Sequence, residues 1–305
     1  MANTISTKTY RDKYRQASLD KLLRKAVVAE AICNVDRSGL KTLQNPYSSQ
    51  PTVTVQAIAG TYTVSTFTTT DDTLTVADEV IIAEHVFDFE ETLTNFDIFA
   101  NRVDEQNFQV AYAIDKFVLN TLAANAGDTY ATPSGSFATA ANLPVIVANL
   151  LSKVAGYSDM FRGTYLVVEN TDLVGMIQQQ MNSGFNYADS ALRNGFVGNY
   201  GGVDVYVVRT GTFQSYTAGT QTFTNQGKRL FGVKGTATYA SPRGVRFEEK
   251  AVSGKTGMEV VTYAYIGAKV WATKSALTIA ITGTNAPSTS PSASLSPSAS
   301  PSPSA

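Results

Sequence analysis

The chain has 305 residues, of which 43% are hydrophobic and only 16% are charged, and its formal net charge is −1. This length allows a sizeable core and two sub-domains, and the net charge excludes a chain that is basic overall, as many nucleic-acid-binding domains are. The charged fraction lies well below the roughly 25% of an average soluble protein. Such a surface suits a protein inside a large assembly, or a β-rich secreted protein.

Cysteine content, targeting segments and the distribution of charge narrow the possible classes of protein further. Cys33 is the only cysteine, which excludes a disulfide framework and a cysteine-based metal site. The N-terminus lacks the apolar segment of a signal peptide, and no run of 18 apolar residues predicts a membrane span. Residues 8–25 are strongly basic and residues 71–105 strongly acidic. This pattern favours charge-matched contact between copies, or else marks two ordinary solvated faces.

The first third of the chain is expected to form a helix and a β-hairpin arm. The apolar spacing of residues 9–33 predicts an amphipathic helix with a basic face. Residues 43–51, which contain two prolines, are expected to be a linker. Residues 52–93 alternate with period two and predict strands separated by Gly60 and by the Asp71-Asp72 pair. Because a hairpin alone is marginally stable in water, this arm should lie against something else.

The next segments predict helices and buried strands. Residues 96–125 carry an apolar stripe at helical spacing, which predicts a helix of about thirty residues, far above the mean of about 11 to 12. Residues 143–155 predict a second helix with proline in its first turn. Residues 164–168 and 203–208 predict buried strands with a short helix after the first, so an α/β sub-domain fits residues 140–240.

The C-terminal part returns to strands and ends in a low-complexity tail. Residues 244–281 predict three strands. Residues 283–305 contain nine serines and five prolines. This composition predicts a disordered or polyproline-like tail.

Four glycines stand before the strand at 203–208, at positions 195, 198, 201 and 202. They could cradle a phosphate or form turns. A dinucleotide-binding fingerprint follows a strand and opens a helix, whereas here a strand follows the glycines. We therefore interpret Asn194-Gly195 and Gly201-Gly202 as turns.

The other candidate motifs are equally weak. The sequence Gly254-Lys255-Thr256 resembles the end of a phosphate-binding loop, but Glu249 stands where that motif requires glycine. His85 is the only histidine, and it shares a strand face with Phe87, which favours a packed or interfacial role and leaves no Ser/His/Asp set. The acidic segment leaves open a site for a hard metal ion. We predict no catalytic, cofactor-binding or metal-ligating residue and no cofactor.

Three stretches carry a resemblance to the major capsid protein of tailed bacteriophages, which has the Hong Kong 97-type fold. Residues 80–123 resemble that family's run from the hairpin arm into the spine helix. Residues 165–208 resemble the strand, helix, glycine turn and strand of its axial domain. Residues 265–281 resemble the closing strands of its peripheral domain. Each stretch alone is degenerate, and their order is the stronger signal.

The resemblance implies an α+β fold with an N-terminal arm, an extended β-hairpin arm (the E-loop), a long spine helix, a peripheral β-sheet and an α/β axial domain. The implied division is an N-terminal arm with a basic helix at 1–49, the E-loop at 50–93, a peripheral domain with the spine helix at 94–139, the axial domain at 140–242, returning strands of the peripheral domain at 243–282, and a Ser/Pro-rich tail at 283–305. The tail is not part of the family's common fold.

The function implied by the resemblance is structural and not enzymatic. Subunits would form hexamers and pentamers of an icosahedral shell around packaged double-stranded DNA, which is contacted without sequence reading. The partners expected are other copies of the chain, a separate scaffolding protein, a portal and a decoration protein, but no membrane. The location expected is the virion, after assembly in the host cytoplasm. The alternatives are an encapsulin-type shell that encloses enzymes, a β-rich surface adhesin and an enzyme using residues 140–240.

Overall fold

The chain mixes helices and strands, as expected for an α+β protein. The computed structural model describes residues 28–48, 55, 58, 60, 64, 68–86, 98–133, 137, 142–156, 163–173, 176, 196–219, 221–251 and 258–283. The predicted basic helix before Val28, the Gly254-Lys255-Thr256 motif and the Ser/Pro tail therefore lie outside the described residues. So do Gly195 and Phe87.

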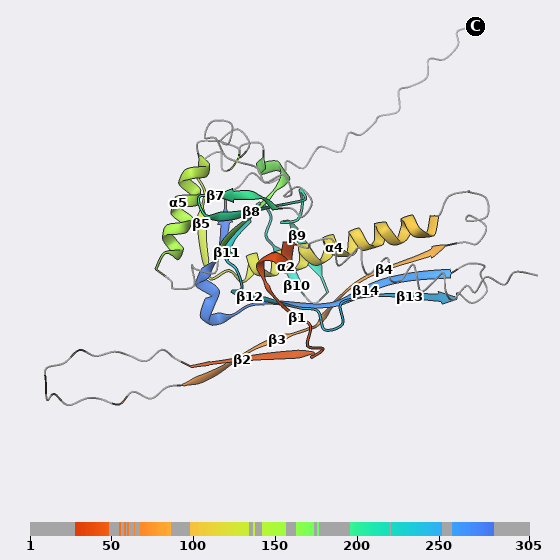
Figure 1. The fold of residues 1–305 in the computed structure, drawn as a ribbon, viewed down its shortest axis with the longest axis horizontal. Coiled ribbons are helices and arrows are strands. Elements are labelled where there is room, and N and C mark those ends of the chain that lie inside the picture. Colours follow the sequence, from red (N-terminus) through yellow and green to blue (C-terminus); the bar gives the residue numbers. More distant parts are fainter. Residues whose placement is uncertain are drawn as a thin grey trace, which may run out of the picture.

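One long strand, β14 (Met258–Val270), organises the first sheet. Along residues 258–266 it pairs antiparallel with β4 (Asp78–Val86), and along 258–264 it pairs on its other side with β13 (Val245–Ala251). Its C-terminal end pairs with β12 (Ala237–Ala240), which in turn pairs in parallel with β1 (Asn34–Asp36). The strands predicted between 244 and 270 are confirmed, and β14 spans the whole length of this sheet (Figure 1).

The second sheet has six strands in the order β5-β15-β11-β6-β8-β7. These are β5 (Asp128–Ala131), β15 (Thr278–Thr282), β11 (Arg229–Val233), β6 (Thr164–Glu169), β8 (Val203–Val208) and β7 (Phe196–Tyr200). The buried strands predicted at 164–168 and 203–208 are confirmed as β6 and β8. Two strands, β5 and β15, come from outside the 140–240 segment.

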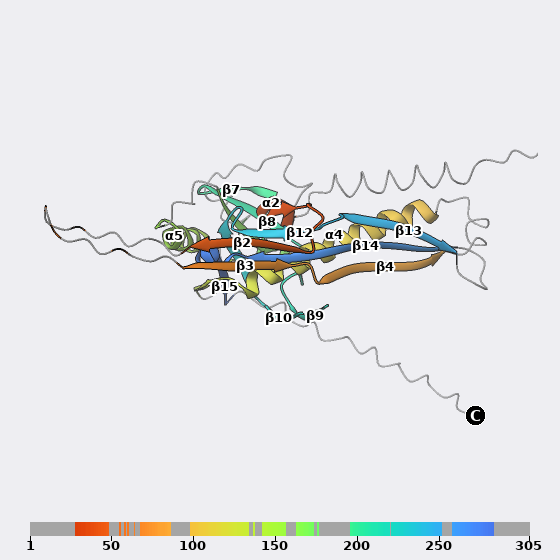
Figure 2. The ribbon, with the colours of Figure 1, turned by 90° about the horizontal axis from the view of Figure 1, so that it is seen from below.

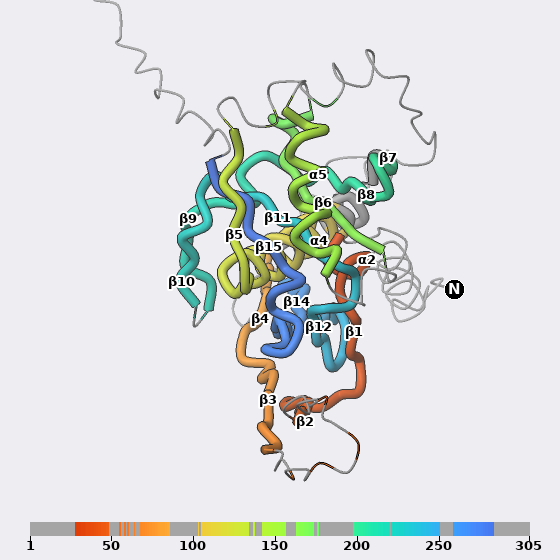
Figure 3. The backbone as a smooth tube through the Cα atoms, turned by 90° about the vertical axis from the view of Figure 1, so that its left-hand side faces the viewer, coloured from red at the N-terminus to blue at the C-terminus, as the bar shows by residue number. Residues whose placement is uncertain are grey.

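Helices cover both faces of this six-stranded sheet (Figure 3). Because side chains alternate along a strand, Leu166 and Val168 of β6 pack toward α5 (Asn142–Val154), while Tyr165 and Val167 pack in the cluster that contains α4. The helix predicted at 143–155 is therefore confirmed as α5. Of the helix predicted after β6, the described part contains the 3₁₀ turn η3 (Asn170–Asp172).

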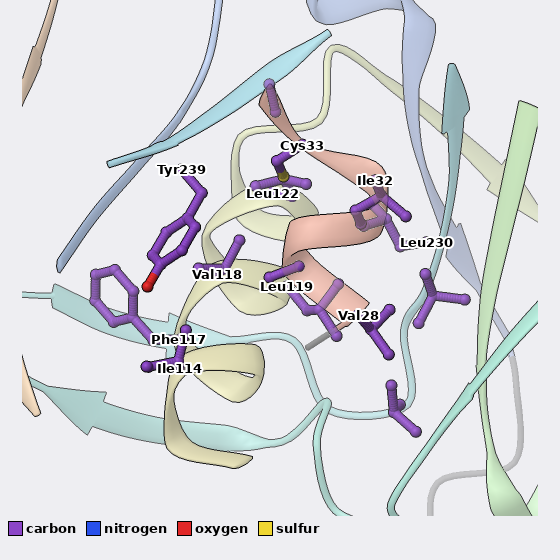
Figure 4. Packing of buried hydrophobic residues seen from close by; sticks show 14 of the residues in the cluster. Val28, Ile32, Cys33, Ile114, Phe117, Val118, Leu119, Leu122, Leu230 and Tyr239 are labelled. Carbon is purple, nitrogen blue, oxygen red and sulfur yellow. The ribbon is translucent and has the colours of Figure 1, made fainter. Parts of the chain in front are cut away.

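Helix α4 (Ile98–Ala124) confirms the predicted helix of about thirty residues and connects the two sheets. Its C-terminal half packs with α2 (Val28–Ile32) in the main core (Figure 4). The hairpin of β9 (Ser215–Ala218) and β10 (Gln221–Thr224) also packs there, with the rings of Phe117 and Phe223 5.9 Å apart. Near its N-terminal end, Val103 packs with Phe247 and Val260 of the first sheet. No helix in the described part of the chain is long and apolar enough to cross a membrane.

Three expectations about the hairpin arm are wrong. The segment expected to be a linker forms β2 (Thr42–Ser48), which pairs with β3 (Thr69–Thr75), and Asp71 and Asp72 lie within β3 instead of in a turn. Pro46 is compatible with β2 because a strand in a two-stranded ribbon has a free edge. The strand predicted from residue 80 also leaves the arm. As β4 it belongs to the main sheet, since its apolar residues Val80 and Ile82 pack against the main core.

A cluster of three charged side chains lies inside the second sheet. Arg229 and Glu169 are fully buried and Asp172 nearly so. The Arg229 guanidinium contacts the Asp172 carboxylate, and its Nη2 lies 3.1 Å from Glu169 Oε2. Glu169 Oε1 accepts the backbone N–H groups of Gly211 and Phe213, at 3.1 and 2.9 Å. The cluster thus ties together β6, η3, β11 and the loop after β8.

Replacing Arg229 with methionine should destabilise the protein by roughly 3–5 kcal/mol, because it leaves two buried carboxylates without a cation. Chemical unfolding of the unassembled protein measures this loss. The matched control is Lys234→Met, which removes a partly exposed ion pair with Asp204 and should cost less than about 1 kcal/mol. Equal losses for the two variants would contradict the role assigned to the cluster.

Asp115 of α4 holds the start of α2. Its two carboxylate oxygens accept the backbone N–H groups of Val28, at 3.2 Å, and Ala29, at 2.8 Å. Burial raises the pKa of Asp115 to about 7, against the opposing effect of these two hydrogen bonds, and the carboxylate of Glu30 adds to the rise. The link spans 87 residues of sequence and ties α2 to α4.

Asp115 should make stability fall as the pH rises. Between its ordinary value of 3.8 and about 7, the folded state keeps a proton that the unfolded chain releases, so the free energy of unfolding decreases with increasing pH. Asp115→Asn removes this titration and should flatten that slope. Unfolding curves of both proteins from pH 4.5 to 8 test the prediction, and parallel profiles would refute it.

Candidate assembly surfaces

The first candidate surface is the arm, defined as residues 42–75. Its strands β2 and β3 form a separate two-stranded ribbon that projects from the body (Figures 1 and 2). Farther along the arm, Val55, Ile58 and Val64 are 96%, 101% and 78% exposed. Single exposed hydrophobic residues are normal, but three branched aliphatic side chains in one short segment mark a surface that gains from burial.

The second candidate surface is the face of the β4–β14–β13 sheet that points away from α4, which we call the open face. On the covered face, Gln106 of α4 donates to Glu84 Oε2 at 3.0 Å and accepts from Thr262 Oγ1 at 2.8 Å. Because side chains alternate, the neighbours of these residues point the other way. Ile81 lies opposite Tyr263 in the register, so both belong to the open face.

The centre of the open face is apolar and aromatic. Ile81 is 57% exposed and Tyr265 is 40% exposed. The rings of Tyr263 and Tyr265 are 5.7 Å apart in an edge-to-face arrangement. The Tyr263 hydroxyl donates to Glu248 Oε1 at 2.6 Å, and this hydrogen bond lowers the pKa of Glu248. An aromatic centre with charged residues at its border has the anatomy of a protein–protein interface.

The strand face that carries His85, the only histidine of the chain, lies on the side of the sheet away from α4. This strand face also carries Ile81 and Ala83, and the register with β14 makes it the open face. Sequence reasoning could not tell which face α4 would cover. The misleading residue was Glu84. A carboxylate on a strand normally indicates a solvent-facing side, but here it accepts a hydrogen bond from the Gln106 amide on the covered face.

The glycine turn is confirmed where it is described. Gly201 and Gly202 have φ of +60° and +87° and connect β7 to β8. These are left-handed conformations that other residues rarely adopt. Asn199 Oδ1 accepts the Gly202 N–H at 3.0 Å, so a side chain of the same hairpin closes the turn.

The acidic residues are distributed among separate contacts. Within the described ranges, no group of three or more His, Cys, Asp or Glu side chains could hold a metal ion. Asp72 pairs with Lys269, and Glu105 accepts the Gln109 amide at 2.7 Å. Glu90 and Glu91 lie outside the described residues.

The fold is similar to solved capsid structures. A capsid structure of the cyanophage P-SCSP1u matches with a TM-score of 0.63 and 14% identity, covering 85% of this chain and 88% of that one. A structure of Mycobacterium phage Che8 matches with a TM-score of 0.63 and 18% identity, over 84% and 90%. A virus-like particle from Pyrococcus furiosus matches with a TM-score of 0.58 and 10% identity, over 88% and 98%.

These similarities establish the fold. No protein-family model and no curated protein sequence matches the chain. The shared fold confirms, at the level of architecture, the resemblance to phage capsid proteins that the sequence indicated.

Proposed function

We propose that this chain is a major capsid protein that assembles into hexamers and pentamers of an icosahedral shell around double-stranded DNA. The observation that carries the proposal is a fold shared with phage capsid structures over most of both chains. Fold alone does not imply function. The second support is therefore the combination, in one molecule, of exposed aliphatic side chains on the arm and exposed Ile81 and Tyr265 on the sheet face.

The arm and the open face are arranged for head-to-tail contact. Figure 1 shows the arm on the side of the first sheet opposite to α4, and it extends away from the free end of β4 and β13 (Figure 2). In the proposed ring, the arm of one copy would lie on the open face of the next copy. A head-to-tail contact of this kind closes into a ring when the rotation between copies is right, which is the geometry that a hexamer or pentamer requires.

The contents of the shell distinguish two functions. The second candidate is the encapsulin-type shell, which would enclose proteins instead of a genome. It stays open because the structure of a virus-like particle from Pyrococcus furiosus also matches, over 98% of its own chain. The proposed scaffolding protein, portal and decoration protein, the DNA within and assembly in the host cytoplasm all belong to the first candidate. An adhesin and an enzyme find no comparable support in these similarities.

Electron microscopy of the purified protein, alone and after co-expression with neighbouring genes, tests the proposal. Closed shells or capsomer rings are the expected result, and a monodisperse 32.6 kDa monomer at high concentration under both conditions would overturn it. Nuclease-protected double-stranded DNA in the shells would favour the capsid, and an enclosed protein would favour the nanocompartment.

The open face should be needed for assembly but not for folding. Ile81→Ser combined with Tyr265→Ser should reduce the yield of shells at least about tenfold, since each truncation removes more than about 1 kcal/mol at every copy of a repeated contact. The unfolding free energy should fall by only about 1–2 kcal/mol, from the lost ring pair with Tyr263 and the lower strand propensity of serine. Ile81→Val is the matched control that keeps the apolar surface, and equal yields for all variants would contradict the assignment.

A further inference from the structure

Among the described residues of the arm, those of its inner half contact the body. Leu74 and Val76 are buried in a small cluster with Ala240 and Trp271, and Leu43 of β2 packs against the same cluster. Farther out along β3, residues 69–71 are exposed. The direction of the whole arm therefore depends on the few contacts between residues 72 and 76 and the body.

The first of these contacts is a close crossing at Gly267 of β14. A Cβ atom at this position would lie 3.0 Å from the carbonyl oxygen of Thr75 and 3.2 Å from Cα of Val76. The backbone of the arm root therefore passes directly over β14. Thr75, Val76 and Ala77 also line an open hollow of about 550 Å³, so the crossing leaves space into which this junction can move.

The second contact is made by Asp72. Its Oδ2 accepts the backbone N–H of Ala272 at 2.8 Å, and its Oδ1 pairs with the ammonium group of Lys269. Lys269 also donates to the backbone carbonyl of Thr73 at 2.6 Å. Lys269 lies in β14, and Ala272 begins the 3₁₀ helix η5 (Ala272–Leu277), which leads into β15 of the second sheet. Asp72 thus ties the arm to the segment that joins the two sheets.

Two attachment points define a direction, whereas one defines only a pivot. Asp72 and Val76 are four residues apart, which is about 13 Å along a strand. The backbone crossing at Gly267 survives any change of side chain in the arm, but the contacts of Asp72 depend on its carboxylate. Burial alone would raise the pKa of Asp72, but the Ala272 N–H and the Lys269 ammonium together hold it below its usual value. The group is therefore a carboxylate at neutral pH.

We propose that Asp72 is a positioning residue for assembly, which locks the arm at the angle that reaches a neighbouring copy. Without its contacts to Lys269 and Ala272, the arm is held by the crossing at Gly267 and by the apolar packing of Leu43, Leu74 and Val76, which does not define one angle. This inference rests on the proposed function for its consequence, but the locking itself is a property of the single chain. The role of Asp72 is distinct from that of the exposed apolar residues of the arm. Asp72 sets the direction of the arm, and not its affinity for a neighbouring copy.

The chain provides a matched control in the next residue. Asp71 lies on the same strand and is exposed, so Asp71→Asn changes the charge equally without touching the body. Asp72→Asn keeps the size of the side chain but removes the ion pair with Lys269. Lys269→Met removes the same pair from the other side and should reproduce the effect of Asp72→Asn.

The direction of the arm can be measured in the unassembled full-length protein. Spin labels at Ser48→Cys on β2 and Ser152→Cys on α5, both exposed, report the distance between the arm and the body, and the native Cys33 is buried. We expect one narrow distance distribution for the parent and for Asp71→Asn. For Asp72→Asn and Lys269→Met we expect a broad one, with the parent distance reduced at least about tenfold in population, because hydrogen bonds to charged groups are lost.

We call the contacts of Asp72 with Lys269 and Ala272 the latch. Trp271 gives a second reading, since it is the only tryptophan of the chain and is buried beside the latch. Its emission should shift to longer wavelength in Asp72→Asn and stay unchanged in Asp71→Asn. Lys269→Met is left out of this reading, because Lys269 Nζ lies 5.9 Å from the centre of the Trp271 ring and its loss alters the emission directly. The yield of shells should fall in Asp72→Asn and in Lys269→Met, relative to the parent protein without spin labels.

The outcomes separate the latch from the proposed function. Identical distance distributions for Asp72→Asn and Asp71→Asn would overturn the proposal, as would a broadened distribution with undiminished shell yield. If the parent chain forms no shells under any condition, the proposed function fails. The distance measurement then still decides whether Asp72 sets the direction of the arm.

Discussion

The structure depends on the pairing of one strand, β14. Its first nine residues have hydrogen-bonded neighbours on both sides for most of their length, and its last four pair with β12. Beyond its end the chain passes through η5 and enters the second sheet as β15. This one continuous segment therefore fixes the positions of the other parts, which are the sheet under α4, the root of the arm and the six-stranded sheet.

Charge and apolar surface are distributed in an unusual way around this framework. The protein buries Arg229 with two carboxylates in its interior, yet it leaves Ile81, Tyr265 and three aliphatic side chains of the arm exposed. A buried ion cluster does little for stability compared with apolar packing but is costly to break. It therefore acts mainly as a constraint on the loop after β8, while apolar surface is kept available for contact between molecules.

Sequence periodicity predicted the elements whose signals are local. α4 and α5 carry apolar residues at helical spacing, whereas β6 and β8 are short apolar runs of the length of a buried strand. It failed at β2 and at Asp71-Asp72, where proline and paired acids indicate turns, because the contacts that hold this ribbon come from Lys269 and Ala272, some 200 residues away. The open face was half predicted: the register follows from alternation, but its exposure depends on where α4 packs.

The residues that hold the arm root lie in the body, far from the arm in sequence. This separation explains why the arm root is suited to control assembly. A two-stranded ribbon is marginally stable by itself, so its orientation is set by the body and costs little to change. In a symmetric shell every copy makes the same contact, and a small bias in the angle of each arm is multiplied over all copies. A latch made of one carboxylate, one ammonium group and one backbone N–H is weak enough to open and specific enough to define a single angle. An apolar contact of equal strength lacks this directionality, since apolar surfaces slide over one another and hydrogen bonds do not.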